Sequence, residues 1–185
     1  MTLMQSDPEA LPRSAIAPEF TLKNAATGTD ASLTDFKGKP IAVIFMCNHC
    51  PYVIPKMDEI KKLQDEFGED IPVICINPNN NPAYEEDDWE HTVALAKKLK
   101  YTYYLFDETQ EIAKAYGAVC TPDVFVFDAE HHLVYHGRIN DDTGTSNSPK
   151  QHDLRDVLTA VIDGKEIEDW FRPSQGCSIK WNQRD

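Results

Sequence analysis

The run IAVIFM at residues 41–46 leads directly into two cysteines, in CNHC at residues 47–50. A continuous apolar run rich in β-branched residues is typical of a strand that is buried on both faces of a sheet. From Pro51 onward, apolar residues recur every three or four positions as far as Gly68, which predicts an amphipathic helix. The sequence therefore predicts a strand and a helix joined by a short turn that carries both cysteines.

The remainder of the chain continues this alternation of strands and helices. Further strands are predicted at residues 71–76, 103–106, 124–127 and 132–139, and further helices around Trp89–Leu99, up to Tyr116 and from Pro149. Strands that alternate with helices predict an α/β fold, in which helices cover a sheet that contains parallel strands.

The length of 185 residues suits one domain with a substantial core. We expect residues 1–16 to form a flexible N-terminal arm and residues 17–170 to form the domain. Short alternating runs around Gly28 predict a β-hairpin at the start of that domain. Residues 171–185 are irregular, but Ile179 and Trp181 predict a tail that docks on the domain.

Charge and composition exclude several classes of partner. A formal charge of −13 and a pI near 4.8 argue against nucleic acid and anionic membranes, which select basic surfaces. The sequence has no apolar run of membrane-spanning length and no signal-peptide core, so a cytoplasmic location is predicted. Five scattered cysteines do not suggest an extracellular disulfide framework. In a reducing compartment, a close pair is more often catalytic or metal-binding.

The predicted position of the pair favours redox chemistry. At a helix N-terminus, unpaired N–H groups and the helix dipole stabilise a thiolate, which predicts an exposed, low-pKa nucleophile at Cys47. A protonated His49 would add to this effect. Cys50, deeper in the helix, would then resolve mixed disulfides. A structural zinc site usually needs two such pairs, and the sequence has only one, so neither a metal nor another cofactor is predicted.

Two motifs together resemble the thioredoxin-like superfamily: CNHCP after a buried strand and GAVCTPDVFVFD about seventy residues later. The resemblance implies that Pro122 is a cis-proline that faces the dithiol, and that Thr121 and Pro122 form the substrate-docking loop. Pro55 is similar to the proline that kinks the corresponding helix in thioredoxins.

The segments APEFTLKNAATGTDASLTDFKGKPIAVIF, DETQEIAKAYGAVCTPDVFVFD, LVYHGRIND and GCSIKW resemble peroxiredoxin-like proteins of the alkyl hydroperoxide reductase/thiol-specific antioxidant group. This likeness covers about residues 17–181. It implies a thioredoxin-like fold with a central mixed sheet flanked by helices and an N-terminal β-hairpin extension.

The sequence differs from both families at functional positions. Counting back from Cys47, Pro40 matches the peroxiredoxin motif, but Ile44 occupies the position of its peroxide-activating threonine. Thr121-Pro122 occurs where the peroxiredoxin arginine is expected. Ile41 stands where thioredoxins carry a buried acid.

These observations predict a thiol–disulfide oxidoreductase in which Cys47 attacks, Cys50 resolves, and Asn48 and His49 tune the pair. Cys120, two residues before Pro122, and Cys177 in the tail are candidates for further redox roles. The expected partners are a disulfide-containing protein or a small thiol, together with a reductant.

Two alternatives remain open at this stage. One is a thiol peroxidase that uses Cys47. The other is a metal carrier whose ligands are Cys47, Cys50 and a histidine, although carriers built on this fold usually have CxxxC. Either a monomer or a dimer is compatible with the sequence.

Overall fold

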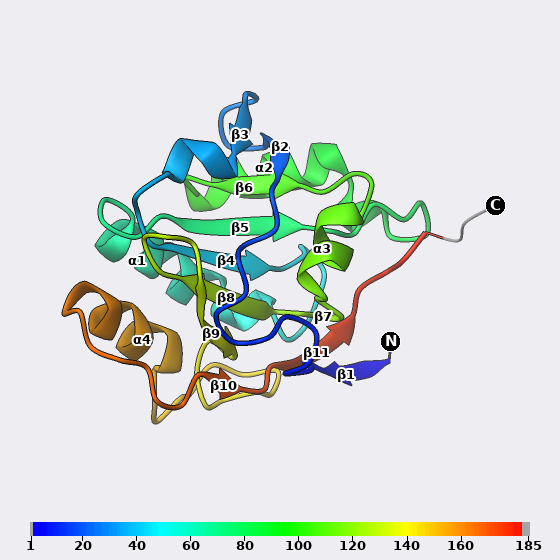
Figure 1. The fold of residues 1–185 in the computed structure, drawn as a ribbon. Coiled ribbons are helices and arrows are strands. Elements are labelled where there is room, and N and C mark those ends of the chain that lie inside the picture. The colour runs from blue at the N-terminus through cyan, green and yellow to red at the C-terminus, as the bar shows by residue number, and fades with distance from the viewer. Residues whose placement is uncertain (1, 183–185) are drawn as a thin grey trace.

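The computed structural model describes residues 2–182, and a large mixed sheet forms its centre (Figure 1). The sheet has the order β10-β9-β8-β4-β5-β6-β2-β3, with β4, β5 and β6 parallel to one another and β8 antiparallel to β4. Its strands are β2 (Thr21–Asn24), β3 (Asp30–Ser32), β4 (Ile41–Phe45), β5 (Val73–Asn77), β6 (Tyr104–Phe106), β8 (Asp123–Phe127), β9 (Leu133–Gly137) and β10 (Phe171–Arg172). The helices are α1 (Met57–Phe67), α2 (Trp89–Leu99), α3 (Glu111–Tyr116) and α4 (Asp153–Ile162), with short 3-10 helices η1 (Leu33–Phe36), η2 (Ile54–Lys56) and η3 (Glu85–Asp87).

Strand β4 lies in the middle of the core, and all its residues are inaccessible to solvent. Because successive side chains alternate across a strand, Val43 and Phe45 belong to one apolar cluster and Ala42 and Ile44 to the other. The second cluster is covered by α1, α2 and α4, and the first by α3 and η1. The prediction of a strand buried on both faces is therefore confirmed.

The predicted N-terminal hairpin is present as β2 and β3, which pair antiparallel. Its turn is closed by the backbone N–H of Gly28, which donates to the carbonyl of Asn24 at 2.7 Å. Gly28 has a φ of +79°, a conformation that glycine adopts without the steric cost of a Cβ atom. The hairpin extends the sheet beyond β6, because β2 also pairs with β6.

A second, three-stranded sheet brings the two ends of the described chain together beside the dithiol. It has the order β1-β11-β7, with β1 at Leu3–Gln5, β11 at Gln175–Ser178 and β7 at Cys120–Thr121 (Figure 1). All its pairings are antiparallel, and Cys177 of β11 lies opposite Thr121 of β7. A Cβ atom at Gly176 would lie 1.9 Å from the Thr121 carbonyl oxygen, so only glycine permits this approach.

Part of the predicted N-terminal arm, residues 1–16, takes part in this small sheet. Residues 3–5 form β1, Leu11 is buried, and the methyl group of Ala10 closely approaches Gly117. The N-terminal segment therefore packs on the domain, because its backbone pairs with β11 and its apolar side chains reach the core. The tail contributes β11 and the buried Ile179, while residues 183–185 lie outside the described residues.

The helix after the cysteines begins later than predicted, at Met57 rather than near Cys50. The N–H groups of Val53 and Ile54 both donate to the carbonyl of Cys50, which makes a turn, and η2 follows. Pro51 and Pro55 have no N–H to donate and so interrupt the hydrogen-bond ladder here. The dithiol therefore precedes α1 by several residues, and the dipole of that helix acts only weakly on the sulfurs, because its effect fades within one turn.

Candidate active site

Cys47 and Cys50 lie in the bend between β4 and α1, where they meet the loop that contains Pro122. The Sγ atom of Cys47 lies 3.5 Å from the hydroxyl oxygen of Thr121, and the Sγ atom of Cys50 lies 3.2 Å from the carbonyl oxygen of the same residue. The Thr121–Pro122 peptide bond is cis. The structure thus brings together the two cysteines and the two docking-loop residues that the sequence analysis singled out.

Both sulfurs are buried, with Cys47 1% and Cys50 0% exposed, which corrects the expectation of an exposed thiol at Cys47. The hydrogen bond from Cys47 lowers the pKa of Cys50 to about 5, and contacts with Thr121 and Cys177 contribute further. Burial raises the pKa of Cys47 well above its usual range, with added contributions from the bond to Cys50 and from the charge of Asp87. The directions of these two pKa shifts favour the thiolate at Cys50, the reverse of the predicted order, because hydrogen bonds rather than a helix N-terminus act on the sulfurs.

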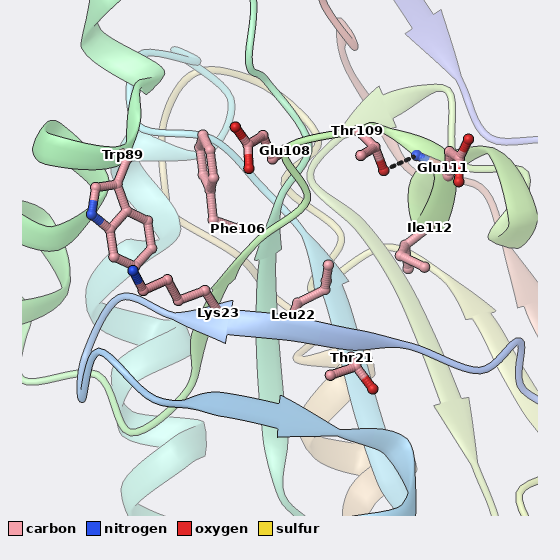
Figure 2. A pocket seen from close by; sticks show the side chains of 9 residues that line it. All are labelled: Thr21, Leu22, Lys23, Trp89, Phe106, Glu108, Thr109, Glu111 and Ile112. Carbon is pink, nitrogen blue, oxygen red and sulfur yellow. Dashed lines mark hydrogen bonds between the residues drawn. The ribbon is translucent and has the colours of Figure 1, made fainter.

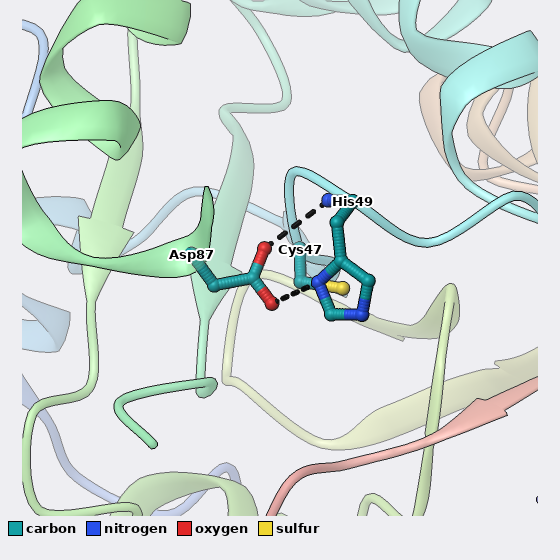
Figure 3. Close-up of side chains that lie close together, drawn as sticks. All are labelled: Cys47, His49 and Asp87. Atoms are coloured by element: carbon teal, nitrogen blue, oxygen red, sulfur yellow. Dashed lines mark hydrogen bonds and ion pairs between the residues drawn. The ribbon is translucent and has the colours of Figure 1, made fainter. Parts of the chain in front are cut away.

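The partly buried imidazole of His49 is hydrogen-bonded to the buried carboxylate of Asp87 from η3 (Figure 3). Its Nδ1 atom lies 2.5 Å from Oδ2 of Asp87, and its ring stacks on Tyr84 with the ring centroids 5.1 Å apart. The hydrogen bond to Asp87 raises the pKa of His49, which makes the imidazole a better proton acceptor. Its other nitrogen, Nε2, is buried and has no hydrogen-bond partner among residues 2–182.

The sulfur of Cys47 lies beside this hydrogen-bonded pair. Its Sγ atom, one ring nitrogen of His49 and one carboxylate oxygen of Asp87 all lie within 4.8 Å of one another. Figure 3 shows the carboxylate reaching the Nδ1 atom of the imidazole. A thiol, an imidazole and a carboxylate grouped in this way are the residue types of a nucleophile activated by an oriented base.

Asp87 holds the cysteine loop as well as the imidazole. Its Oδ1 atom accepts the backbone N–H groups of Asn48 at 2.8 Å and of His49 at 3.1 Å, and its Oδ2 atom accepts the amide of Asn79 at 2.7 Å besides His49. The sequence analysis missed this residue. Asp87 belongs to the acidic run EEDD before a helix, and only its complete burial distinguishes it from its neighbours.

Asn48, expected to tune the pair, anchors the loop instead. Its amide donates to the carbonyl of Glu86 at 2.8 Å and to the hydroxyl of Thr92 at 3.3 Å, and its Oδ1 atom accepts the hydroxyl of Tyr104 at 2.7 Å. Because these bonds use both ends of the side-chain amide, Asn48 acts on the sulfurs through the geometry of the loop.

The other three cysteines differ in whether they contact the Cys47–Cys50 dithiol. Cys177 contacts Cys50 through both its backbone and its side chain. Cys120 directs its sulfur to the carbonyl of Pro122 at 4.0 Å, and Cys75 is fully buried in β5. Burial raises the pKa of both Cys120 and Cys75. Of the two further redox candidates, Cys177 is therefore the one in contact with the dithiol.

A cavity of about 590 Å³ lies away from these residues, between β2 and the segments that carry Trp89 and Glu108 (Figure 2). Lys23 extends over the Trp89 ring there, with its Nζ atom 4.9 Å from the ring centroid. None of the nine residues that line this cavity belongs to the cysteine site. We therefore do not assign the redox chemistry to it.

The fold, with a dithiol opposite a cis-proline, defines a thioredoxin-like protein. A family model described as Redoxin matches residues 13–158, and the chain belongs to this family. Together with its similarity to a thioredoxin-like protein and to a glutathione peroxidase, this places the chain in the thioredoxin-like superfamily, with likeness to the peroxiredoxins.

Solved structures share the fold. An uncharacterized conserved protein from Geobacillus kaustophilus is 35% identical and superposes with a TM-score of 0.92, over 100% of this chain and 99% of that chain. The thioredoxin domain of a thiol-disulfide oxidoreductase from Bacteroides vulgatus shares the fold at 20% identity, with a TM-score of 0.60 over 82% of this chain and 99% of that domain.

Among curated proteins, the thioredoxin-like protein YneN of Bacillus subtilis is 26% identical over 112 residues. The match covers 60% of this chain and 63% of that protein, so the chain spans less than two thirds of that relative. Within residues 2–182, no helix is both long enough and apolar enough to cross a bilayer.

Proposed function

We propose that this protein exchanges the Cys47–Cys50 dithiol for the disulfide of a protein or a small thiol compound. The observation that carries the proposal is the hydrogen-bonded pair of sulfurs, both within 3.5 Å of an oxygen of Thr121 in the cis-proline loop. Two thiols so close together can be oxidised to a disulfide, and this reversible two-electron reaction is what dithiol exchange requires.

Cys47 is the sulfur that attacks the substrate. Cys50 is covered by Thr121 and Cys177, whereas Cys47 adjoins His49, whose side chain is 11% exposed. His49 accepts the proton of Cys47, and Asp87 stabilises the resulting imidazolium. The Cys47 thiolate then forms a bond to one sulfur of the substrate disulfide, and the other substrate sulfur leaves as a thiolate that takes up a proton.

Cys50 completes the reaction as the resolving thiol, and its contacts with Thr121 and Cys177, which also lower its pKa, do not depend on the Cys47 proton. It attacks the sulfur of Cys47, and the second half of the substrate leaves as a thiol. The substrate disulfide is thereby reduced by two electrons, and Cys47–Cys50 becomes the disulfide. A cellular dithiol reductant then restores the pair, and we assign this cycle to the cytoplasm, where such reductants are maintained.

Mixed-disulfide capture tests the proposal. A Cys50→Ser variant retains the attacking sulfur and loses the resolving one, so it should accumulate mixed disulfides when it is offered glutathione disulfide or a disulfide-bonded peptide. A Cys47→Ser variant should capture neither compound, and a Cys75→Ala variant provides the control, since Cys75 lies in β5 outside the site. Equal capture by the Cys47 and Cys50 variants would refute the assigned order of attack. Absence of capture by both, together with no 47–50 disulfide in oxidised wild-type protein, would refute the function.

A thiol peroxidase is the second candidate, and one contact favours it. The hydroxyl of Thr121 lies 3.5 Å from the sulfur of Cys47 and could serve in place of the threonine replaced by Ile44. Thr121-Pro122 stands where the peroxiredoxin arginine is expected, whereas Cys50, hydrogen-bonded to Cys47, provides the second sulfur that dithiol exchange needs. Dithiol exchange is therefore the function that the geometry supports best.

A further inference from the structure

The tail strand β11 occupies the edge of β7, the edge that a docking substrate peptide would be expected to use. Cys177 pairs with Thr121, and Ser178 pairs with Cys120, so the tail runs antiparallel to the residues just before Pro122. An extended segment added to a strand edge in this way is a common mode of peptide recognition. The tail therefore lies on this loop as an extended peptide would, and it presents a cysteine opposite Thr121.

The sulfur of Cys50 is in direct contact with this cysteine. Both the backbone N–H and the side chain of Cys177 make hydrogen bonds to Cys50, while Cys47 makes a hydrogen bond to Cys50 as well. Cys50 is therefore the middle member of a row of three thiols, Cys47, Cys50 and Cys177. All three are buried, with Cys177 3% exposed.

We propose that Cys177 is a third redox cysteine, which takes over the disulfide from Cys47–Cys50 to give a Cys50–Cys177 disulfide. This proposal rests on the function proposed above and assigns to the tail the regulation of the same site. In the step, the sulfur of Cys177 forms a bond to the sulfur of Cys50, and the Cys47–Cys50 bond breaks. Cys47 leaves as a thiolate and takes up the proton that Cys177 has lost. No external oxidant or reductant takes part, because one disulfide replaces another.

The charges around Cys177 make this step dependent on the redox state of the pair. In the reduced protein, burial raises the pKa of Cys177, and the neighbouring Cys50 raises it further, to about 12. Once Cys50 is bonded to Cys47, it no longer carries a charge, and that second contribution disappears. The charge of Lys180 favours the Cys177 thiolate, while burial, the largest cause, opposes it. Oxidation of the pair therefore makes the Cys177 thiolate easier to form than it is in the reduced protein.

The consequence for the cycle is a protected oxidised form. In this form Cys47 is again a thiol, and the disulfide joins Cys50 to Cys177 beneath the tail. Cys120, although buried in the same region, lacks this relation, because its sulfur faces the carbonyl of Pro122. It is therefore the matched control for a buried cysteine next to the site.

Disulfide mapping by mass spectrometry tests the proposal. The full-length protein is oxidised with glutathione disulfide and digested without reduction. Wild-type protein and a Cys120→Ala variant should both yield peptides linked through 47–50 and through 50–177. A Cys47→Ser variant, which lacks the sulfur that attacks the oxidant, should form neither link. A Cys177→Ala variant should yield the 47–50 link alone.

The outcomes separate this proposal from the function on which it rests. If 47–50 forms in the wild-type protein but 50–177 does not, Cys177 is not a redox cysteine, and the proposed function stands. If the Cys47→Ser variant forms the 50–177 link as readily as the wild type, that link does not arise from the 47–50 disulfide, and the third-cysteine proposal likewise fails. If none of the cysteines forms an internal disulfide, the dithiol function fails together with it.

Discussion

Asp87 binds His49 at two points: Oδ1 accepts its backbone N–H at 3.1 Å, and Oδ2 accepts its Nδ1 atom at 2.5 Å. One carboxylate thus fixes both the position of the histidine in the loop and the orientation of its ring. The imidazole is directed by a residue 38 positions away in the sequence. This relationship makes Asp87 a positioning residue whose removal should alter the chemistry of Cys47 without any contact with the substrate.

An Asp87→Asn variant should lose about 10²-fold in its rate of disulfide exchange, in line with the contribution of a positioned base. Because Asp87 raises the pKa of His49, the variant should also move the ascending limb of the pH–rate profile to lower pH. Stopped-flow exchange with a chromogenic disulfide measures both effects.

The neighbouring Asp88 offers a matched control for that experiment. It caps α2 by accepting the N–H of His91 at 2.8 Å, and asparagine caps helices about equally well. Asp88→Asn should therefore leave the rate and the profile unchanged. An Asp87→Asn profile that coincides with the wild type would show that the ion pair is only structural.

The thiolate of the reduced protein should titrate near pH 5, because the pKa of Cys50 is lowered to about 5 from an ordinary value of 9.0. A group whose pKa is lower in the folded protein than in the unfolded protein stabilises the fold fully at pH values above its unfolded pKa. For Cys50 this stabilisation is lost as the pH falls from about 9 to about 5. The reduced protein should therefore gain stability from this group as the pH rises through that window, while the oxidised protein should not.

Thiolate absorbance and urea unfolding at a series of pH values check this. The bond from Cys47 is the largest cause of the lowered pKa, so Cys47→Ala should move the absorbance midpoint of Cys50 upward. A midpoint near 9 in the wild type would contradict the hydrogen-bonded pair, and a midpoint that survives Cys50→Ser would assign the thiolate to Cys47.

Hydrogen peroxide should oxidise Cys47 at a rate close to that of free cysteine. Ile44 supplies no hydroxyl where peroxiredoxins have threonine, and the charge of Asp87 opposes formation of the thiolate. Stopped-flow oxidation of wild-type protein measures the rate, with Cys47→Ser as the blank. A rate many orders of magnitude above that of free cysteine would instead support the peroxidase candidate.

Protein purified without a chelator should carry no stoichiometric zinc or copper. Cys47, His49 and Asp87 offer three ligand types within 4.8 Å, but both oxygens of Asp87 already accept two hydrogen bonds each. Elemental analysis decides this point. About one metal ion per chain, lost in Cys47→Ser, would favour the carrier alternative.

The tail should contribute measurably to stability. Ile179 is 3% exposed and belongs to the apolar cluster on the α3 face of the sheet, so Ile179→Ala should lower the free energy of unfolding by about 2–5 kcal/mol. Ile162, which is 51% exposed, provides the comparison, and Ile162→Ala should change it by at most about 0.5 kcal/mol. Equal effects in urea denaturation would mean that the tail is not docked in solution.

The sequence predicted those features that depend on neighbouring residues. The buried strand before Cys47 followed from an unbroken apolar run, and the hairpin from alternation around Gly28. The prediction that the loop with Thr121 faces Cys47 came from the resemblance to a known fold and not from a local sequence pattern.

Contacts between distant segments were not predictable in this way. Asp87 is one of four consecutive acidic residues, and only the fold buries it against His49. The predicted order of the two thiol pKa values assumed that a helix begins at the dithiol. Pro51 and Pro55 delay that helix, and Cys177 supplies hydrogen bonds that no local pattern could reveal.

The meeting of β1 with β11 has a consequence for how the protein folds (Figure 1). The N–H of Ser174 donates to the hydroxyl of Ser6 at 2.8 Å across a separation of 168 residues, so this contact closes almost the whole described chain into a loop. Contacts of such long range carry a high entropic cost and form slowly. We therefore expect the large sheet to assemble first. The dithiol then passes through an interval in which it is formed but not yet covered, when it is most open to oxidants and to other chains.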